Sequence, residues 1–213
     1  MSLGEYIGAG SGTTKLLLHL NGNSTDSSGN GNNGTDTNIS YSQANGKFGQ
    51  GAGFNASGLI TTNLIFGGND NQTRNIWFKL ANTTQNGDLL YDFDNTTHVS
   101  FELKFNAGNL AFNRIKQGVV VQSTNGSFSD ATSWHLATCT YDGSTIKLYV
   151  DGKRLGTDTA ASGDGKTVST SINHIGCNGY VGNLDEAIFE NYAWTPQEVA
   201  KYYTMTKGRF GII

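Results

Sequence analysis

The chain has 213 residues, 36% of them hydrophobic and 11% aromatic, which is enough for one sizeable core and excludes a disordered composition. Charged residues make up 15%, and 14 Lys and Arg stand against 17 Asp and Glu without any basic run, so we expect no nucleic-acid partner. Glycine occurs 29 times and proline once, which is typical of tight turns between strands and not of a helical bundle.

The N-terminal segment, residues 1–14, is rich in glycine and small residues and predicts a flexible arm. Residues 15–213 are then expected to form one domain. The arm has no basic start followed by an apolar run, so no secretory signal is expected. No stretch of the sequence approaches the length of a membrane span.

Short strands separated by polar turns follow along the first two thirds of the chain. An apolar run at residues 15–20 predicts the first strand, and residues 21–38 predict a polar loop without core residues. Further short strands are expected from the β-rich runs at residues 48–54, 59–62, 76–80 and 89–93. Residues 99–105, 110–115 and 119–122 alternate polar and apolar side chains, which predicts a meander.

The segment WHLATCTYDGSTIKLYVDGKRLG, at residues 134–156, predicts three consecutive hairpin strands. Ile146, Leu148 and Val150 would face one side of the middle strand, as in a half-buried antiparallel strand. Asp142-Gly143 and Asp151-Gly152 would supply the positive φ angles of two-residue turns. We interpret this segment as scaffold.

One helix is predicted near the end of the chain, in AWTPQEVAKYY. Thr195 can cap it, Pro196 suits its first position, and Glu198 completes a capping box. Trp194 and Val199 occupy the positions of a hydrophobic staple.

Cys139 and Cys177 are the only cysteines. Two interpretations stay open for them, a disulfide or a pair of buried small apolar residues, and the second is favoured. The four histidines are scattered, and no spacing resembles a zinc site.

The order of motifs resembles the concanavalin A-like, laminin-G-like jelly-roll family in its bacterial and phage form. The matching segments span residues 15–203: LLLHLNGNSTDSSGNGNNGT, GKFGQGAGFN, IWFKL, the hairpin segment above and IGCNGYVGNLDEAIFENYAWTPQEVAKYY. The resemblance implies an all-β fold, a two-sheet antiparallel jelly-roll sandwich with one short C-terminal helix. This scaffold hosts lectins, glycosidases, adhesion modules and structural spacers, so the site has to decide the function.

Glycoside hydrolysis requires two carboxylates held across a cleft. The related laminarinase-type enzymes carry Glu-x-Asp-x-x-Glu on one strand. The nearest segment here, NLDEAIFE at residues 183–190, lacks the first Glu, and Asp185, Glu186 and Glu190 do not fit the motif. Glu102 stands alone in VSFELKF. We therefore expect no enzyme activity and no catalytic residue.

Calcium is the cofactor that the polar loop suggests, because hard cations prefer several oxygen ligands. The resemblance implies that Asp26 of the D-S-S-G-N-G segment lies near Asp185, which alternation places on one face with Ala187 and Phe189. One interpretation has Asp26, Asn30 and Asp185 ligate calcium. The other has Asp26 and Asn30 form Asx-turns while Asp185 accepts backbone N–H bonds, and both stay open.

Sugar binding would use aromatic platforms with Asn or Asp side chains on loops. The exposed candidates for ligand binding are Tyr180, Asn178, Tyr41, Asn95 and His98. The three tryptophans are expected in the core or in the helix staple.

The sequence thus predicts a non-enzymatic, lectin-like carbohydrate-binding module on the surface of a phage virion, acting in receptor binding or adhesion. The expected partner is a cell-surface glycan or another virion protein, with a homo-oligomer as a further option. The alternative is a structural virion decoration or fibre protein without a glycan ligand, and a glycoside hydrolase ranks third. The alternative location is extracellular or on a cell surface.

Overall fold

The computed structural model describes residues 12–64, 70–93, 99–116, 119–161 and 172–208. Most of the expected N-terminal arm therefore lies outside the described residues. The first strand begins at Thr14, the last residue of the predicted arm. Thr14 is buried, and its Oγ1 donates to Glu190 Oε1 at 2.8 Å.

Strands make up most of the described chain, as the all-β prediction requires. They are β1 (Thr14–Leu18), β2 (Gly34–Ser42), β3 (Gly51–Thr62), β4 (Gln72–Leu80), β5 (Asn86–Phe93), β6 (Val99–Asn106), β7 (Asn109–Lys116), β8 (Val119–Ser127), β9 (His135–Tyr141), β10 (Thr145–Val150), β11 (Lys153–Ala160), β12 (Ile172–Cys177) and β13 (Gly182–Glu190). A short 3₁₀ turn, η1 (Gln43–Asn45), follows β2, and the helix α2 (Pro196–Thr206) follows β13.

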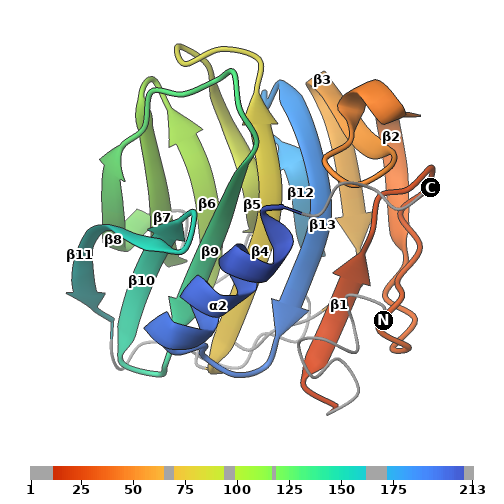
Figure 1. The fold of residues 1–213 in the computed structure, drawn as a ribbon. Coiled ribbons are helices and arrows are strands. Elements are labelled where there is room, and N and C mark those ends of the chain that lie inside the picture. Colours follow the sequence, from red (N-terminus) through yellow and green to blue (C-terminus); the bar gives the residue numbers. More distant parts are fainter. Residues whose placement is uncertain (1–11, 65–69, 94–98, 117–118, 162–171, 209–213) are drawn as a thin grey trace.

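The strands pair in the order β11-β10-β9-β4-β13-β3-β12-β5-β6-β7-β8, with β1 added to β13 and β2 added to β3. This continuous antiparallel sheet folds over into two layers (Figure 1). Its two ends return to each other, because Thr124 Oγ1 of β8 donates to Thr157 O of β11 at 2.6 Å. The fold is the predicted two-layer sandwich, and it is nearly closed.

Helix α2 lies across the outer face of one layer (Figure 1). We call the strands β1, β13, β4, β9, β10 and β11 the helix-covered layer, and β12, β5, β6, β7 and β8 the open layer. The main core lies between the layers and includes Leu16, Phe78 and Leu103. A second cluster, with Leu17 and Trp77, lies between the helix-covered layer and α2. Where α2 covers that layer, both of its faces are therefore buried.

The hairpin segment agrees with its prediction on the inner face, where Ile146 and Leu148 enter the main core. Its outer face differs, because Tyr149 is only 3% exposed beneath α2 and the strand is buried on both sides. The turn Asp151-Gly152 has the expected positive φ angles of 53° and 75°. The first turn is longer than predicted, because Ser144 joins Asp142-Gly143 in the loop between β9 and β10.

Strand β3 was predicted as two short strands and is one strand with a four-residue excursion, Asn55–Gly58. Ile39 pairs with Phe54 and Thr37 pairs with Leu59, so the residues between them have no partner on β2. Before the excursion β3 pairs with β13, and after it β3 pairs with β12. The excursion therefore marks the place where β3 passes from one layer to the other.

The C-terminal helix confirms its sequence signals. Thr195 and Glu198 form the capping box, and Trp194 and Val199 both pack in the cluster beneath α2. The described part of the chain has no helix with the length and apolarity that crossing a membrane requires. Cys139 and Cys177 are buried free thiols, so the favoured interpretation of the cysteines is confirmed.

Candidate functional site

The outer face of the open layer carries two neighbouring rows of side chains across β12, β5 and β6. His174, Tyr91 and Glu102 form one row, because Tyr91 pairs with both of the others. Cys177, Asp88 and Lys104 form the second row, because Asp88 pairs with both of the others. Leu90, Leu103 and Ile175 point inward to the main core. Alternation therefore turns the polar members of these strands outward.

Asp88 and Glu102 are the centre of a hydrogen-bonded network on this face. Lys104 Nζ lies 3.1 Å from Glu102 Oε1 and 3.7 Å from Asp88 Oδ1. Asn113 Nδ2 donates to Glu102 Oε2 at 2.7 Å, and Asn178 Nδ2 donates to Asp88 Oδ2. One ammonium group thus stands between two carboxylates, which leaves the network with an excess of acceptors.

The pKa of Asp88 is raised from 3.8 to about 6, chiefly by burial and also by the negative charge of Glu102, while Asn178 and Lys104 act in the opposite direction. Asp88 is 1% exposed. The carboxyl group is therefore ionised at neutral pH and gains a proton under mildly acidic conditions.

A pocket of about 440 Å³ opens beside this network, lined by Ala56–Leu59, Tyr91, His174, Cys177, Asn178 and Gly179. The excursion of β3 forms one wall, and the turn after β12 forms another. The rings of Tyr91 and His174 lie 6.4 Å apart between centroids, inclined at 55°, and both side chains are partly exposed. Burial lowers the pKa of His174, so its imidazole is neutral at neutral pH. The pocket combines ring surfaces with a neighbouring carboxylate and amide.

Of the predicted ligand-binding residues that the structure describes, Asn178 alone lines this pocket. Tyr180 was predicted as exposed, which is wrong: its side chain is 0% exposed and its hydroxyl donates to the carbonyls of Asn183 at 3.2 Å and Lys79 at 3.3 Å. Tyr41 lies on β2 and donates to Asp36 Oδ2 at 2.8 Å. Asn95 and His98 lie outside the described residues.

The other residues of the site were not found from the sequence. Glu102 was seen as an isolated carboxylate, and Asp88, Tyr91 and His174 were not singled out. They lie on three different strands and share no local motif. The available signal was alternation in β6, where Glu102 and Lys104 interrupt Phe101, Leu103 and Phe105.

The predicted calcium residue Asp26 organises the polar loop through four hydrogen bonds. Its Oδ1 accepts from the main-chain N–H groups of Leu17 at 3.0 Å and Ser28 at 2.9 Å. Its Oδ2 accepts from Ser28 Oγ at 2.9 Å and from the main-chain N–H of Asn32 at 2.8 Å. Asn30 uses its amide nitrogen, which donates to Thr14 O at 2.8 Å. These contacts are those of an Asx-turn that ties the loop to β1.

Asp185 faces α2 and not the main core, so its predicted face is wrong. Asp185 and Ile188, the partners of Trp77 and Asn75, are three positions apart on β13, whereas Trp77 and Asn75 are two positions apart on β4. Glu186, in between, has a positive φ of 50°. This β-bulge reverses the alternation, because an extra residue shifts every following side chain to the other face. Ala187 and Phe189 therefore enter the main core while Asp185 lies opposite Trp77.

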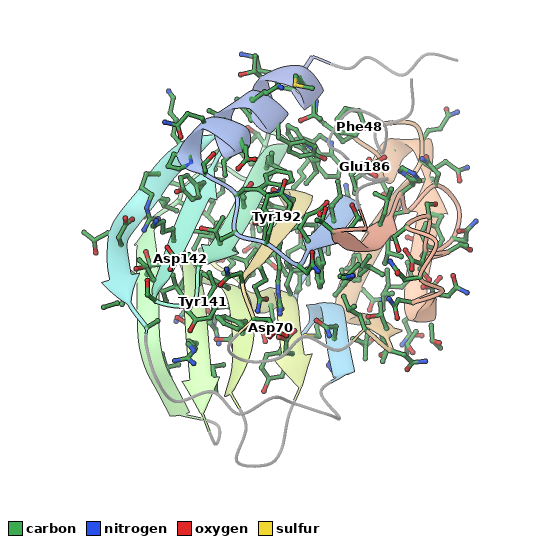
Figure 2. The ribbon with its side chains drawn as sticks, turned by 90° about the horizontal axis from the view of Figure 1, so that it is seen from below. Phe48, Asp70, Tyr141, Asp142, Glu186 and Tyr192 are labelled. Atoms are coloured by element: carbon green, nitrogen blue, oxygen red, sulfur yellow. The ribbon has the colours of Figure 1, made fainter. Side chains whose placement is uncertain are left out.

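The main-chain N–H groups of Lys47 and Phe48 donate to Asp185 Oδ2 at 2.8 and 2.9 Å. Figure 2 shows Phe48 close to Glu186, the neighbour of Asp185 on β13. Asp185 Oδ1 is buried and has no hydrogen-bond partner among the described residues. The pKa of Asp185 is raised from 3.8 to about 8, chiefly by burial and also by the charge of Glu186, while main-chain N–H groups, including those of Phe48 and Lys47, act in the opposite direction.

The donor set does not fit the predicted calcium site as it stands. Asp26 and Asp185 each hold a different stretch of backbone, and the amide oxygen of Asn30 would have to replace its nitrogen. No three His, Cys, Asp or Glu side chains of the described ranges gather into a group that could hold a metal ion. Calcium binding by this loop stays a prediction.

Comparison with known proteins gives the family. The sequence profile of the concanavalin A-like lectin/glucanases superfamily matches residues 51–200. The chain belongs to this superfamily, as the order of its motifs indicated. No curated protein matches the chain at a significant level.

Several solved structures share the fold. One is domain 4 of AbnA, a GH43 extracellular arabinanase from Geobacillus stearothermophilus, in complex with arabinotriose, with 19% identity, a TM-score of 0.74 and coverage of 90% of this chain and 98% of that chain. The binding domain of Paraclostridial Mosquitocidal Protein 1 has 15% identity, a TM-score of 0.73 and coverage of 92% and 53%. The receptor binding domain of botulinum neurotoxin D has 14% identity, a TM-score of 0.73 and coverage of 95% and 54%. The chain spans about half of each toxin domain, and at these identities the likeness shows the fold alone.

Proposed function

We propose that this protein is a non-enzymatic carbohydrate-binding module and that its ligand occupies the pocket at Tyr91 and His174. The observation that carries the proposal is the place of this ring pair. It lies on the outer face that α2 does not cover, directly beside the Asp88–Glu102 network.

The chemistry of the pocket suits a saccharide. A sugar offers C–H groups on the faces of its ring and hydroxyl groups around the rim, so it needs an apolar ring surface and hydrogen-bonding groups close together. Tyr91 provides the ring surface, and the neutral imidazole of His174 can both donate and accept. The acceptor excess of the network suits hydroxyl donors, because charged acceptors form the stronger hydrogen bonds.

A binding role fits the two carboxylates better than hydrolysis does. Asp88 and Glu102 are 1% and 7% exposed, and Lys104, Asn113 and Asn178 already engage them. A glycosidase requires an acid and a second carboxylate that reach the glycosidic bond from both sides. The similar arabinanase domain, whose structure contains an oligosaccharide, supports the same class of ligand.

The test is binding to a glycan array, followed by calorimetric titration of arabinotriose and of each array hit. Tyr91→Ala and His174→Ala should weaken binding about tenfold or more, the loss expected for a ring contact or a hydrogen bond of the site. Tyr41→Ala is the matched control, because Tyr41 is a partly exposed tyrosine that does not line this pocket. Loss of binding in Tyr41→Ala alone would move the site to β2, and no binding to any glycan would refute the proposal.

The second part of the proposal concerns where the protein is located. We propose a location on the surface of a phage virion, with receptor binding or adhesion as the role, supported by the composition rich in Asn, Gly and Thr. Mass spectrometry of purified particles tests this location. Detection in virions without glycan binding would favour the alternative, a structural decoration or fibre protein, and detection only in a cell-surface fraction would overturn the virion assignment.

A further inference from the structure

A second pocket, of about 590 Å³, lies on the other side of the β3 excursion. Asn55 lines this pocket and Ala56–Gly58 line the first, so the excursion separates the two and no lining residue is shared. The second pocket crosses four hydrogen-bonded strands, β2, β3, β13 and β4. Ser40, Gly53, Asn183 and Lys79 are register partners in one row across them.

Two glycines allow neighbouring groups to approach the backbone of this row closely. A Cβ at Gly53 would lie 2.4 Å from Asn45 Nδ2, and a Cβ at Gly182 would lie 2.3 Å from Lys79 O. Gly182 also has a φ of 151°, a conformation that side chains rarely adopt. The Asn45 amide therefore lies directly against the backbone of β3 in this row, where a side chain at position 53 would displace it.

The charge of this pocket is unusual for the chain. The protein has a net charge of −3, yet no Asp or Glu lines the pocket, and Lys79 is its only ionisable lining residue. The rest of the polar lining is neutral, with the amides of Asn38, Asn45, Asn55 and Asn183. Lys79 is partly buried, and no carboxylate of the described residues forms an ion pair with it.

Lys79 lines the pocket and has no carboxylate partner among the described residues, so its positive charge can attract an anion from solution. Amide N–H groups beside it can complete the coordination of that anion. We propose that this second pocket binds the anionic group, a carboxylate or a sulfate, of a charged saccharide. Lys79 pairs with the charge, and the Asn183 amide beside it in the row orients the group. The Tyr91 pocket has no such cation among its lining residues, so the two pockets differ in the ligand they select.

The experiment is an NMR titration of the ¹⁵N-labelled full chain with glucuronic acid, glucose 6-sulfate, inorganic sulfate and uncharged glucose. We expect the two charged sugars to shift the amide signals of Gly53, Gly182 and Asn183, and glucose to bind about tenfold more weakly or not at all. The affinity for the charged sugars should fall with added sodium chloride, because salt screens the charge. A stronger response to glucuronic acid identifies the carboxylate, and a stronger response to the sulfate ester identifies the sulfate.

Lys79→Gln should weaken binding of the charged sugars about tenfold, while Lys79→Arg retains it. Lys153→Gln is the matched control, because Lys153 is an exposed lysine on β11 outside the pocket. Unchanged binding in Lys79→Gln, equal binding of glucose, or binding of inorganic sulfate alone would overturn the proposal. Tyr91→Ala should leave these shifts intact, so failure of the first site and failure of this one are distinguished in the same series.

Discussion

The guanidinium of Arg74 on β4 and the carboxylate of Asp92 on β5 form a bidentate ion pair inside the sandwich, with N–O distances of 2.5 and 2.6 Å. The two side chains are 2% and 4% exposed. The guanidinium also lies over the rings of Phe101 and Phe189, at 5.4 and 5.1 Å from their centroids. Because β4 and β5 belong to opposite layers, this pair links the layers through the core.

We expect Asp92→Ala to lower the free energy of unfolding by about 3–5 kcal/mol, because it leaves the guanidinium buried without its counter-charge. The double variant Arg74→Met with Asp92→Ala should recover part of this loss, since it leaves neither charge in the core. Equilibrium unfolding in urea measures both values. A loss below about 1 kcal/mol in Asp92→Ala would show that solvent or another group compensates the charge.

The buried Asp185 predicts a pH dependence of stability. Its pKa is raised from 3.8 to about 8 in the folded chain, so between these values the folded state binds more protons than the unfolded state. Stability therefore falls as pH rises through this window, by an amount on the order of a few kcal/mol. Asp185→Asn keeps an oxygen acceptor for the N–H groups of Lys47 and Phe48 and should flatten this profile.

Urea unfolding at pH 4, 6 and 8 tests the role of Asp185. Asp158→Asn is the control, because this carboxylate lies on the surface, with its side chain 54% exposed, and should leave the profile unchanged. A profile of Asp185→Asn that parallels the wild type would assign the pH dependence to other carboxyls, of which Glu190 is one whose pKa burial also raises.

A variant of Asp26 distinguishes its two interpretations, a calcium ligand or the acceptor of an Asx-turn. Asp26→Ala removes the acceptor of four hydrogen bonds and should lower the free energy of unfolding by about 2–3 kcal/mol, equally with calcium or with a chelator. Thermal unfolding under both conditions measures this. A calcium-dependent rise of the wild-type midpoint that disappears in Asp26→Ala and Asp185→Ala would instead establish the predicted calcium site.

Removing the N-cap of α2 should lower the free energy of unfolding by less than the changes above. Thr195→Ala removes the side chain that accepts from Glu198 N at 3.3 Å and should cost about 1 kcal/mol of unfolding free energy. Thr204→Ala is the matched control, because Thr204 lies exposed within the helix, where alanine has the higher helix propensity. Equal losses in the two variants would show that the cap does not contribute.

The sequence predicted a structural feature correctly wherever that feature depends only on residues that are neighbours along the chain. The capping box at Thr195 and Glu198 and the turn at Asp151-Gly152 are as predicted, because each depends on a few consecutive residues. Alternation placed Ile146 and Leu148 correctly for the same reason. The motif order also gave the superfamily.

Tertiary structure decided what depends on contacts between distant segments. The bulge at Glu186 places Asp185 on the opposite face of β13 from Ala187 and Phe189. No local sequence pattern indicates an inserted residue in a strand. Tyr180 reads as a loop residue but packs edge-on against Phe54, with 5.8 Å between the ring centroids. The Asp88–Glu102 network and the row of Lys79 exist only through strand pairing, since register brings together residues that are far apart in sequence. The sequence by itself determined the fold family and those elements that depend on neighbouring residues, whereas the pairing of the strands decided which side chains meet on each face, because register is a property of the whole sheet.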